Sequence, residues 1–342
     1  MEDKKYVNFN SDILFIYDAK DTNPNGDPDD ENKPRMDYDR SRNLVTDVRL
    51  KRYIRDYLDG LSDKDYEIFV KKINGESVTA ETRLEKLIED NKDEILAHEN
   101  LKDLFKGDKP NLKALHNHID WLLNKLLDVR LFGATMPIKG DGSKGDSITF
   151  TGPVQFNWGY SLNKVENFLP STISSVFSGA SEGHGNLGKD YRIPYAVIAF
   201  HGIVSAKRGK YTALTEKDIE RLDKAMLWIL YDEANTRSKS GQEPLLYMRV
   251  EYNDDHFFLG DLRKYVKLTD EQGNEIPFDE TAKLDRGKYT LDLSELTEKL
   301  NQLKKQGKIN KIVLFVNEDA KVSGLPEDEN LIEQLDRLSN EK

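Results

Sequence analysis

The sequence predicts an α+β fold with the ferredoxin-like or RRM-like order of elements. Once two long insertions are set aside, the chain reads strand, helix, strand, strand, helix, strand. Apolar runs bounded by turn residues indicate the strands, and apolar residues at helical spacing indicate the helices. This fold presents an open sheet that RNA-binding proteins often use, although a fold alone does not fix a function.

The first part of this core is a strand and a helix that are joined through a turn. Ile13–Ala19 is a continuous apolar run, and the turn-forming stretch NPNGDP (Asn23–Pro28) follows it. Thr46 or Asp47 can cap a helix that runs to about Leu58, because both side chains accept hydrogen bonds from free N–H groups. A glycine two residues later is expected to end this helix.

The other core elements follow from Ile148 onward. The helix after Thr215 carries four apolar residues on one face: Ile219, Leu222, Met226 and Leu230. The expected elements are a strand over Ile148–Tyr160, a strand over Ile193–Ser205, a helix from Thr215 to about Ala234, a strand over Leu245–Tyr252, a helix near Leu293–Gln306 and a last strand, KIVLFVN.

Two insertions interrupt the core order. The stretch from Asp59 to Asp128 is rich in Glu, Lys and Leu, with periodic apolar residues, so we expect it to be helical. The stretch from about Leu162 to Arg192 is rich in small residues, and we expect it to be irregular. The chain after Glu318 is acidic, and we expect it to fray.

Composition narrows the possible functions. The 342 residues carry a net charge of −11, so any nucleic-acid site must be a local basic patch. The chain contains no Cys, which excludes disulfides, thiolate metal sites and Cys nucleophiles and fits a reducing compartment. No segment approaches the roughly 18 apolar residues of a membrane helix, and the N-terminus has no apolar signal core. We therefore expect a soluble cytoplasmic protein.

Basic residues cluster where the first core helix begins. From Arg40 to Arg55 there are six basic residues and one acid, Asp47. Lys51 and Arg55 are one turn apart, and we expect both on a face away from Leu50, where they can reach successive phosphates. Basic side chains beside a helix N-terminus suit phosphate. The alternative is a basic helix face that is only solvated.

The sequence shows no convincing catalytic or metal-binding constellation. The glycines of GDGSKG (Gly140–Gly145) match G-x-G-x-x-G, but a predicted strand follows them, which favours a connecting loop. Asp27, Asp29, Asp30 and Glu31 could hold a hard cation, although neighbours on one loop are more often a solvated turn. The histidines have neither ligand-like spacing nor a recognisable nucleophile beside them.

Five stretches together resemble one known family. They are ILFIYDAKDTNPNGDPDDENKPRMD, RNLVTDVRLKRYIRDYL, DVRLFGATMPI, ITFTGPVQFNWGYSLN and GNLGKDYRIPYAVIAFHGIVSA. In this order they resemble the backbone subunit of the CRISPR Cascade complex, the seventh Cas family of the RAMP superfamily. The closest resemblance is to the Csh-type members of subtype I-B. The last third of the chain adds little to it.

The resemblance implies a hand-shaped protein whose copies stack along a guide RNA. The implied parts are a palm (1–60, 129–161 and 193–317), helical fingers (61–128), a thumb (162–192) and an acidic tail (318–342). The implied backbone contacts are Arg42, Thr46, Arg49, Lys51, Arg52 and Arg55, with Arg130 and Phe132 in the same cleft. The large apolar residues of the thumb are Phe168, Leu169 and Phe177, some of which would wedge beside a displaced base. NPNGDP would frame the start of the basic helix.

The resemblance also implies partners and leaves two alternatives. The partners are the guide RNA (crRNA), target DNA paired to that RNA, further copies of the chain, and the large and small capping subunits of Cascade. No membrane, metal or cofactor is implied, and we expect no enzymatic activity. One alternative is a metal-dependent RNase of the type III kind, with Asp27 in the comparable loop. The other is a scaffold that binds only protein.

Overall fold

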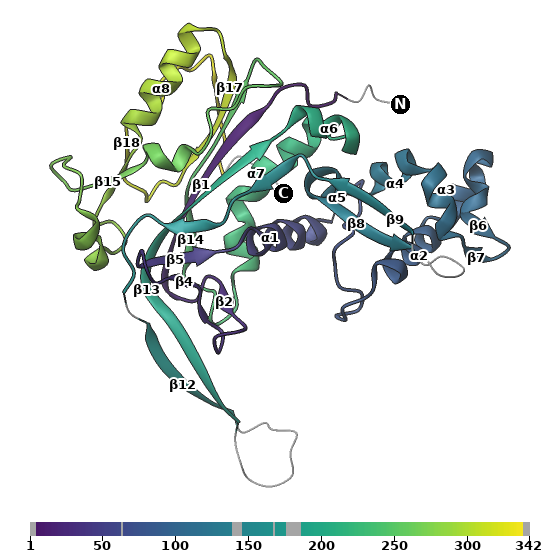
Figure 1. The fold of residues 1–342 in the computed structure, drawn as a ribbon, viewed down its shortest axis with the longest axis horizontal. Coiled ribbons are helices and arrows are strands. Elements are labelled where there is room, and N and C mark those ends of the chain that lie inside the picture. The colour runs from purple at the N-terminus through teal and green to yellow at the C-terminus, as the bar shows by residue number, and fades with distance from the viewer. Residues whose placement is uncertain (1–4, 63, 139–145, 167, 176–185, 338–342) are drawn as a thin grey trace. The chain divides into compact units, whose positions relative to one another are not determined.

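We describe a computed structural model that covers residues 5–62, 64–138, 146–166, 168–175 and 186–337 (Figure 1). The chain divides into two compact units. The sheet unit consists of Phe9–Ile54, Phe156–Ile203 and Leu222–Lys342, and the helical unit consists of Met1–Asn8, Arg55–Gln155 and Val204–Arg221.

The sheet unit is built on a ten-stranded sheet. Its continuous path runs β19-β17-β14-β1-β13-β11-β5-β4, and β10 and β12 pair with β13 off this path. The strands are β1 (Ser11–Thr22), β4 (Met36–Asp37), β5 (Arg42–Val45), β10 (Val154–Phe156), β11 (Gly159–Ser161), β12 (Leu169–Ser175), β13 (Asn186–Val204), β14 (Gln242–Tyr252), β17 (Ile309–Val316) and β19 (Ile332–Gln334). The central strand β1 is buried from Ser11 to Ala19, which explains its continuous apolar run.

The predicted helices of the core are present. They are α1 (Asp47–Gly60), α7 (Glu216–Glu233) and α8 (Ser294–Lys305). Thr215 caps α7 as expected, because its hydroxyl accepts from the N–H of Asp218 at 3.2 Å while the Asp218 carboxylate accepts from the N–H of Thr215 at 3.0 Å. Leu296 and Leu300 of α8 lie in the same apolar core as Met248 of β14.

The C-terminal segment forms strands up to Gln334, so the expectation that the chain frays after Glu318 is wrong there. β18 (Val322–Ser323) pairs in parallel with β16 (Thr290–Asp292), in a small sheet that also holds β15 (Lys267–Thr269). β19 pairs in parallel with β17. The isolated apolar residues of this acidic segment anchor it, since Leu335 is buried.

The single strand expected over Ile148–Tyr160 is wrong. Its first part is β9 (Asp146–Thr151), which pairs with β8 (Gly133–Ile138) in a separate two-stranded sheet, whereas β11 joins the large sheet. The run is broken at Gly152 and Pro153. A Cβ on Gly152 would lie 2.0 Å from the carbonyl carbon of Phe132, and the proline that follows has no N–H to donate to a ladder.

The expected irregular insertion, 162–192, contains a β-hairpin arm. β12 pairs antiparallel with the first part of β13, from Leu169 opposite Arg192 to Ser175 opposite Asn186. Figure 1 shows this arm extending away from the large sheet. The small polar residues of β12 give no clear alternation of apolar and polar positions, which is why the sequence did not indicate a strand. Pairing satisfies the backbone groups that face the partner strand.

The helical unit contains shorter helices than expected for Asp59–Asp128. Between the end of α1 and Ala80 no described residue is helical, and a β-turn hairpin interrupts the rest. The elements are α2 (Ala80–Asp90), α3 (Lys92–Ala97), η1 (Glu99–Leu104), β6 (Phe105–Lys106), β7 (Lys109–Pro110), η2 (Leu112–Asn117), α4 (Ile119–Lys125), α5 (Leu127–Phe132) and α6 (Ala206–Thr212). Gly107, with φ of 65°, and Pro110 account for the interruption. The predicted GDGSKG loop lies outside the described residues.

Candidate nucleic-acid interface

The turn Asn23–Pro28 sets the start of α1. The side-chain oxygen of Asn25 accepts hydrogen bonds from the backbone N–H and from the hydroxyl of Thr46, each at 2.9 Å. The Thr46 hydroxyl accepts in turn from the N–H of Arg49 at 3.2 Å, which is the geometry of an N-cap. A chain of hydrogen bonds therefore links the turn to the first turn of the helix.

A short hairpin closes this turn. It consists of β2 (Gly26–Asp27) and β3 (Lys33–Pro34). The side-chain amide of Asn23 donates to the carbonyl of Asn32 at 2.8 Å. A Cβ on Gly26 would lie 2.0 Å from the side-chain oxygen and 2.9 Å from the backbone oxygen of Asn32, so a larger residue here would displace Asn32. The turn is consequently a fixed frame.

Two acids of this loop, Asp27 and Asp30, make contacts within the fold. Asp27 accepts from the Arg35 guanidinium at 3.0 Å and from the N–H of Asp29 at 3.1 Å. Asp30 pairs with Lys33 at 2.6 Å. Within the described ranges, no group of three or more His, Cys, Asp or Glu side chains could hold a metal ion.

Lys239, in the connection between α7 and β14, contacts this turn. The ammonium of Lys239 donates to the carbonyl of Asn23 at 2.5 Å, and the N–H of Asn23 donates to the carbonyl of Ser238 at 2.8 Å. Burial, followed by the positive charge of Arg49, lowers the pKa of Lys239 to about 7, against the opposing effect of Asp190. The negative charge of Asp190 therefore offsets only part of the effect of burial and of Arg49 on this ammonium.

Arg49 is the cation that faces Lys239. Its guanidinium lies over the ring of Tyr53, 5.5 Å from the centroid. In the part of the chain that the structure describes, neither Arg49 nor Lys239 has a carboxylate within 4.0 Å. We call these two residues the acid-free pair. Two neighbouring cations without an acid suit an anionic ligand such as a phosphate.

Lys51 and Arg55, which we expected to reach successive phosphates from one exposed helix face, both contact carboxylates of the protein. Lys51 is only 9% exposed, and its ammonium lies 3.2 Å from the carboxylate of Asp47. The guanidinium of Arg55 donates to Asp128 at 2.9 Å and lies 5.1 Å from the ring centroid of Phe132. For Arg55 the helical wheel was misleading because it cannot show an acid that comes from a distant helix, whereas the acid of Lys51 lies on α1 itself. Arg52 also lies on α1 and is partly exposed.

Arg130 and Phe132 lie inside the helical unit, where they are 6% and 7% exposed. The guanidinium of Arg130 makes two hydrogen bonds to the Asp218 carboxylate, each at 2.8 Å. It also donates to the carbonyls of Leu123 and Asn124 at 2.7 and 2.9 Å. The guanidinium of Arg130 therefore donates its hydrogen bonds to groups of the protein itself.

Arg42 lies beside a separate pocket of the sheet unit. Its guanidinium donates to the carbonyl of Ser161 at 2.5 Å and lies 5.0 and 4.7 Å from the ring centroids of Tyr160 and Phe278. The pocket has a volume of about 420 Å³ and is lined by Asp39, Arg40, Ser41, Arg42, Lys164, Phe278 and Asp279. Acids and bases alternate there, so its charge is mixed.

The apolar residues assigned to the thumb are only partly described. Phe168 is partly exposed and Leu169, the first residue of β12, is 44% exposed. Phe177 lies outside the described residues. At the base of the arm, Lys189 and Tyr191 of β13 both contact the carboxylate of Glu31, at 3.2 and 3.0 Å. The arm and the frame of α1 are thus joined at the surface.

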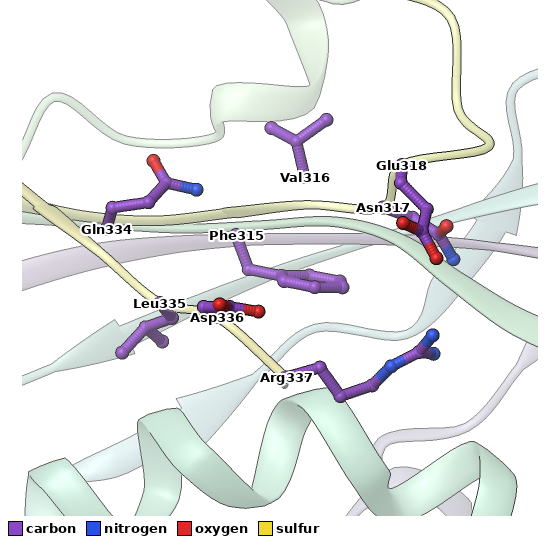
Figure 2. Close-up of a pocket in the computed structure, with 8 residues that line it drawn as sticks. All are labelled: Phe315, Val316, Asn317, Glu318, Gln334, Leu335, Asp336 and Arg337. Carbon is purple, nitrogen blue, oxygen red and sulfur yellow. The ribbon is translucent and has the colours of Figure 1, made fainter. Parts of the chain in front are cut away.

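Figure 2 shows a second pocket of the sheet unit, between the end of β17 and the segment that begins with β19. It has a volume of about 250 Å³ and contains none of the residues predicted from the sequence. The guanidinium of Arg337 lies 4.6 Å from the ring centroid of Tyr231, so the C-terminal segment is held against α7.

Two residues of the candidate interface, Asn25 and Lys239, were not predicted from the sequence. Asn25 was part of the quoted turn, but its role as the acceptor for Thr46 depends on a contact across the fold. Lys239 lies between a predicted helix and a predicted strand, in the stretch NTRSKSGQ. The available signal was that this connection contains two basic residues, Arg237 and Lys239, and no acid.

No helix in the described part of the chain is long and apolar enough to cross a membrane. Two solved structures are similar to this chain. One, named "CRISPR RNA-guided surveillance complex, pre-nicking", has a TM-score of 0.47 and 14% identity and covers 96% of each chain. The other, named "CRISPR RNA-guided surveillance complex", has a TM-score of 0.48 and 15% identity and covers 96% of this chain and 94% of that one.

The sequence comparisons settle the family. A family model described as "CRISPR-associated protein Cas7" matches residues 9–287. The CRISPR-associated protein Cas7 of Haloferax volcanii is 36% identical over 283 residues, which covers 78% of this chain and 77% of the relative. The chain therefore belongs to the CRISPR-associated Cas7 family.

Proposed function

We propose that the chain is the guide-RNA-binding backbone subunit of a CRISPR surveillance complex of the Cascade kind, with subtype I-B as the specific assignment. Membership of the Cas7 family supports the class of function. The single structural observation that carries it is the acid-free pair, Arg49 and Lys239, at the capped start of α1. A phosphate there would supply the negative charge that both cations lack.

We further propose that the core is a modified ferredoxin-like or RRM-like sheet. The supporting observation is the strand order β14-β1-β13-β11, with α1 after β1 and α7 between β13 and β14. Numbered along the chain, these four strands lie in the order 4-1-3-2. The β12–β13 arm is the thumb in this proposal, and it folds over the RNA or against a neighbouring copy.

The binding mode that this geometry supports is independent of base sequence. The turn Asn23–Pro28 fixes Thr46 and thereby the N-terminus of α1. In this proposal, this orients Arg49 toward the RNA strand. Lys239 approaches from the opposite connection and is held by the Asn23 carbonyl. Contacts to phosphate position a strand without reading its bases. The bases of the guide would remain available to pair with target DNA, with the other copies and the remaining Cascade subunits as partners.

We also propose that the chain does not cleave RNA. Asp27, the acid of the RNase alternative, is held by Arg35 and by the N–H of Asp29. To test both proposals, the complex is purified from its host and the bound RNA is sequenced. RNA with a common repeat-derived end supports the backbone role, and absence of RNA would favour a protein-only scaffold. The assembled complex is then incubated with complementary RNA and Mg²⁺ or Mn²⁺. Evenly spaced cuts that disappear in Asp27→Ala would overturn the absence of cleavage.

A further inference from the structure

Helix α6, in the helical unit, has one face fixed in the core. Ala206 and Thr212 are fully buried, and Gly209 between them is buried too. The hydroxyl of Thr212 donates to the backbone carbonyl of Arg130 at 2.8 Å. The helix ends at Ala213, whose φ of 56° is in the left-handed region. This anchoring makes α6 a platform with a defined outer face.

The outer face of α6 is basic and aromatic. Lys207, Arg208 and Lys210 are exposed, and Tyr211 is 74% exposed. Not one acid occurs between Ser205 and Thr215, although the chain has 62 acidic and 51 basic residues. Lys207 and Arg208 precede Tyr211 by four and three positions, so both cations are neighbours of the ring on one helix face.

Ion pairing within the fold does not account for this face. Two other exposed lysines of the helical unit have acids of their own: Lys86 lies 3.1 Å from Asp90, and Lys102 pairs with Glu99. In the described residues, Lys207 and Arg208 have no such partner. The fold thus holds two uncompensated cations beside an exposed ring.

We propose that the outer face of α6 binds a single-stranded nucleic acid, with phosphates at Lys207 and Arg208 and a base stacked on Tyr211. Sequence-independent binding of single strands combines two components. Cations lie along the phosphate backbone, and an aromatic ring stacks on a base of any kind. A protein partner is less suited, because a stable protein interface needs an apolar centre and Tyr211 is the one large apolar side chain of this face. The site goes beyond the proposed guide contact, which lies in the sheet unit.

The first test is the salt dependence of binding. Full-length wild type, the Lys207→Ala, Arg208→Ala variant and a control with Lys86→Ala, Lys102→Ala are titrated with fluorescent oligothymidylate and oligouridylate at several salt concentrations. Two lost phosphate contacts should flatten the slope of log K against log[salt] by about 1.4 and weaken binding about 25-fold at 0.1 M salt. The control removes the same charge from the same unit and should keep the wild-type slope. Equal losses in both variants would overturn the proposal.

The second test concerns the ring. Tyr211→Leu should weaken binding about fivefold or more without changing the salt slope, because stacking releases no counterions. Oligonucleotides with 5-iodouracil should cross-link to Tyr211 under light, and cross-links confined to other peptides would overturn the stacking role. The Arg49→Ala, Lys239→Ala variant is measured in parallel. The Lys207→Ala, Arg208→Ala variant should show its flatter salt slope whatever the result for the Arg49→Ala, Lys239→Ala variant. The two proposals can therefore fail separately.

Discussion

Two basic clusters of this protein look alike in sequence and differ in what surrounds them. In the helical unit, Arg55 pairs with Asp128 and Arg130 pairs with Asp218, at 2.8–2.9 Å. In the sheet unit, Arg49 lies over an aromatic ring, and no carboxylate of the described residues lies within 4.0 Å of its guanidinium. The first cluster is neutral as a whole, whereas in our proposal the second is completed by the negative charge of a ligand.

The sheet unit also neutralises cations that it buries for structural reasons. Arg249 is 1% exposed, and its guanidinium contacts the Asp223 carboxylate at 2.9 and 2.7 Å. The missing acid beside Arg49 and Lys239 is therefore not a general property of this unit. An arginine with a bidentate carboxylate contributes to the fold, and an arginine without one is available for binding.

The largest effect should come from breaking the neutral cluster. Arg130→Ala removes the bidentate partner of the Asp218 carboxylate, which is 1% exposed and would keep only the N–H of Thr215 at 3.0 Å and the guanidinium of Arg221 at 3.4 Å. Breaking this buried pair should cost about 3 kcal/mol of unfolding free energy. Urea unfolding measures this loss. Arg40→Ala is the control, because Arg40 is 77% exposed in its pair with Asp37 and should change stability by less than about 1 kcal/mol. A small loss for Arg130→Ala, equal to the control, would contradict the structural role.

A smaller loss of stability should follow from removing the Thr46 cap, which fixes the part of α1 that carries Arg49. Thr46→Ala removes the hydroxyl that accepts from the N–H of Arg49, so the unfolding free energy should fall by roughly 1 kcal/mol. RNA affinity should fall as well, because the first turn of α1 would no longer be fixed. Thr46→Ser keeps the hydroxyl and should restore both quantities. Failure of Thr46→Ser to restore binding would show that the cap does not position Arg49.

The most subtle effect should be the pH dependence contributed by Lys239. Its pKa is lowered from 10.5 to about 7 in the free protein, so the ammonium loses its proton as pH rises through 7. A bound phosphate favours the charged form, so RNA affinity should be highest below pH 7 and decrease above it. The same group makes the free protein gain stability between about pH 7 and 10.5, where only the unfolded chain still binds this proton.

Lys239→Arg tests this assignment, since an arginine stays charged over this range. Binding of RNA by the variant, measured between pH 6 and 9 at one salt concentration, should lose the decrease that the wild type shows. A decrease of the same size in both proteins would assign the pH dependence to another group.

Local patterns predicted the core elements well and the charged contacts poorly. The apolar run of β1 and the amphipathic face of α7 are visible in sequence because burial selects residues at fixed spacings. The hairpin arm was missed because its strands pair with each other outside the core, where no apolar alternation is required. Gly152 and Pro153 split the expected strand because of a close approach to Phe132 that is not encoded locally.

The charged residues were harder to assign because pairing is decided across the fold. The i,i+4 acid of Lys51 was visible in sequence, but Asp128 and Asp218 were not recognisable as the partners of Arg55 and Arg130. Lys239 could not be placed beside Arg49 without the turn that joins their segments. The basic character of the region was predictable, whereas the identity of the cations that remain available was not.

The central claim is that the acid-free pair, and not the neutral cluster, contacts RNA phosphates. The most direct measurement is the salt dependence of binding of two unrelated RNAs to wild type and to the Arg49→Ala, Lys239→Ala variant, below pH 7, with Lys86→Ala, Lys102→Ala as the control of equal charge. We predict a slope flatter by about 1.4 for the pair variant, equal for both RNAs, and no change for the control. A folded pair variant that keeps the wild-type slope would contradict the claim.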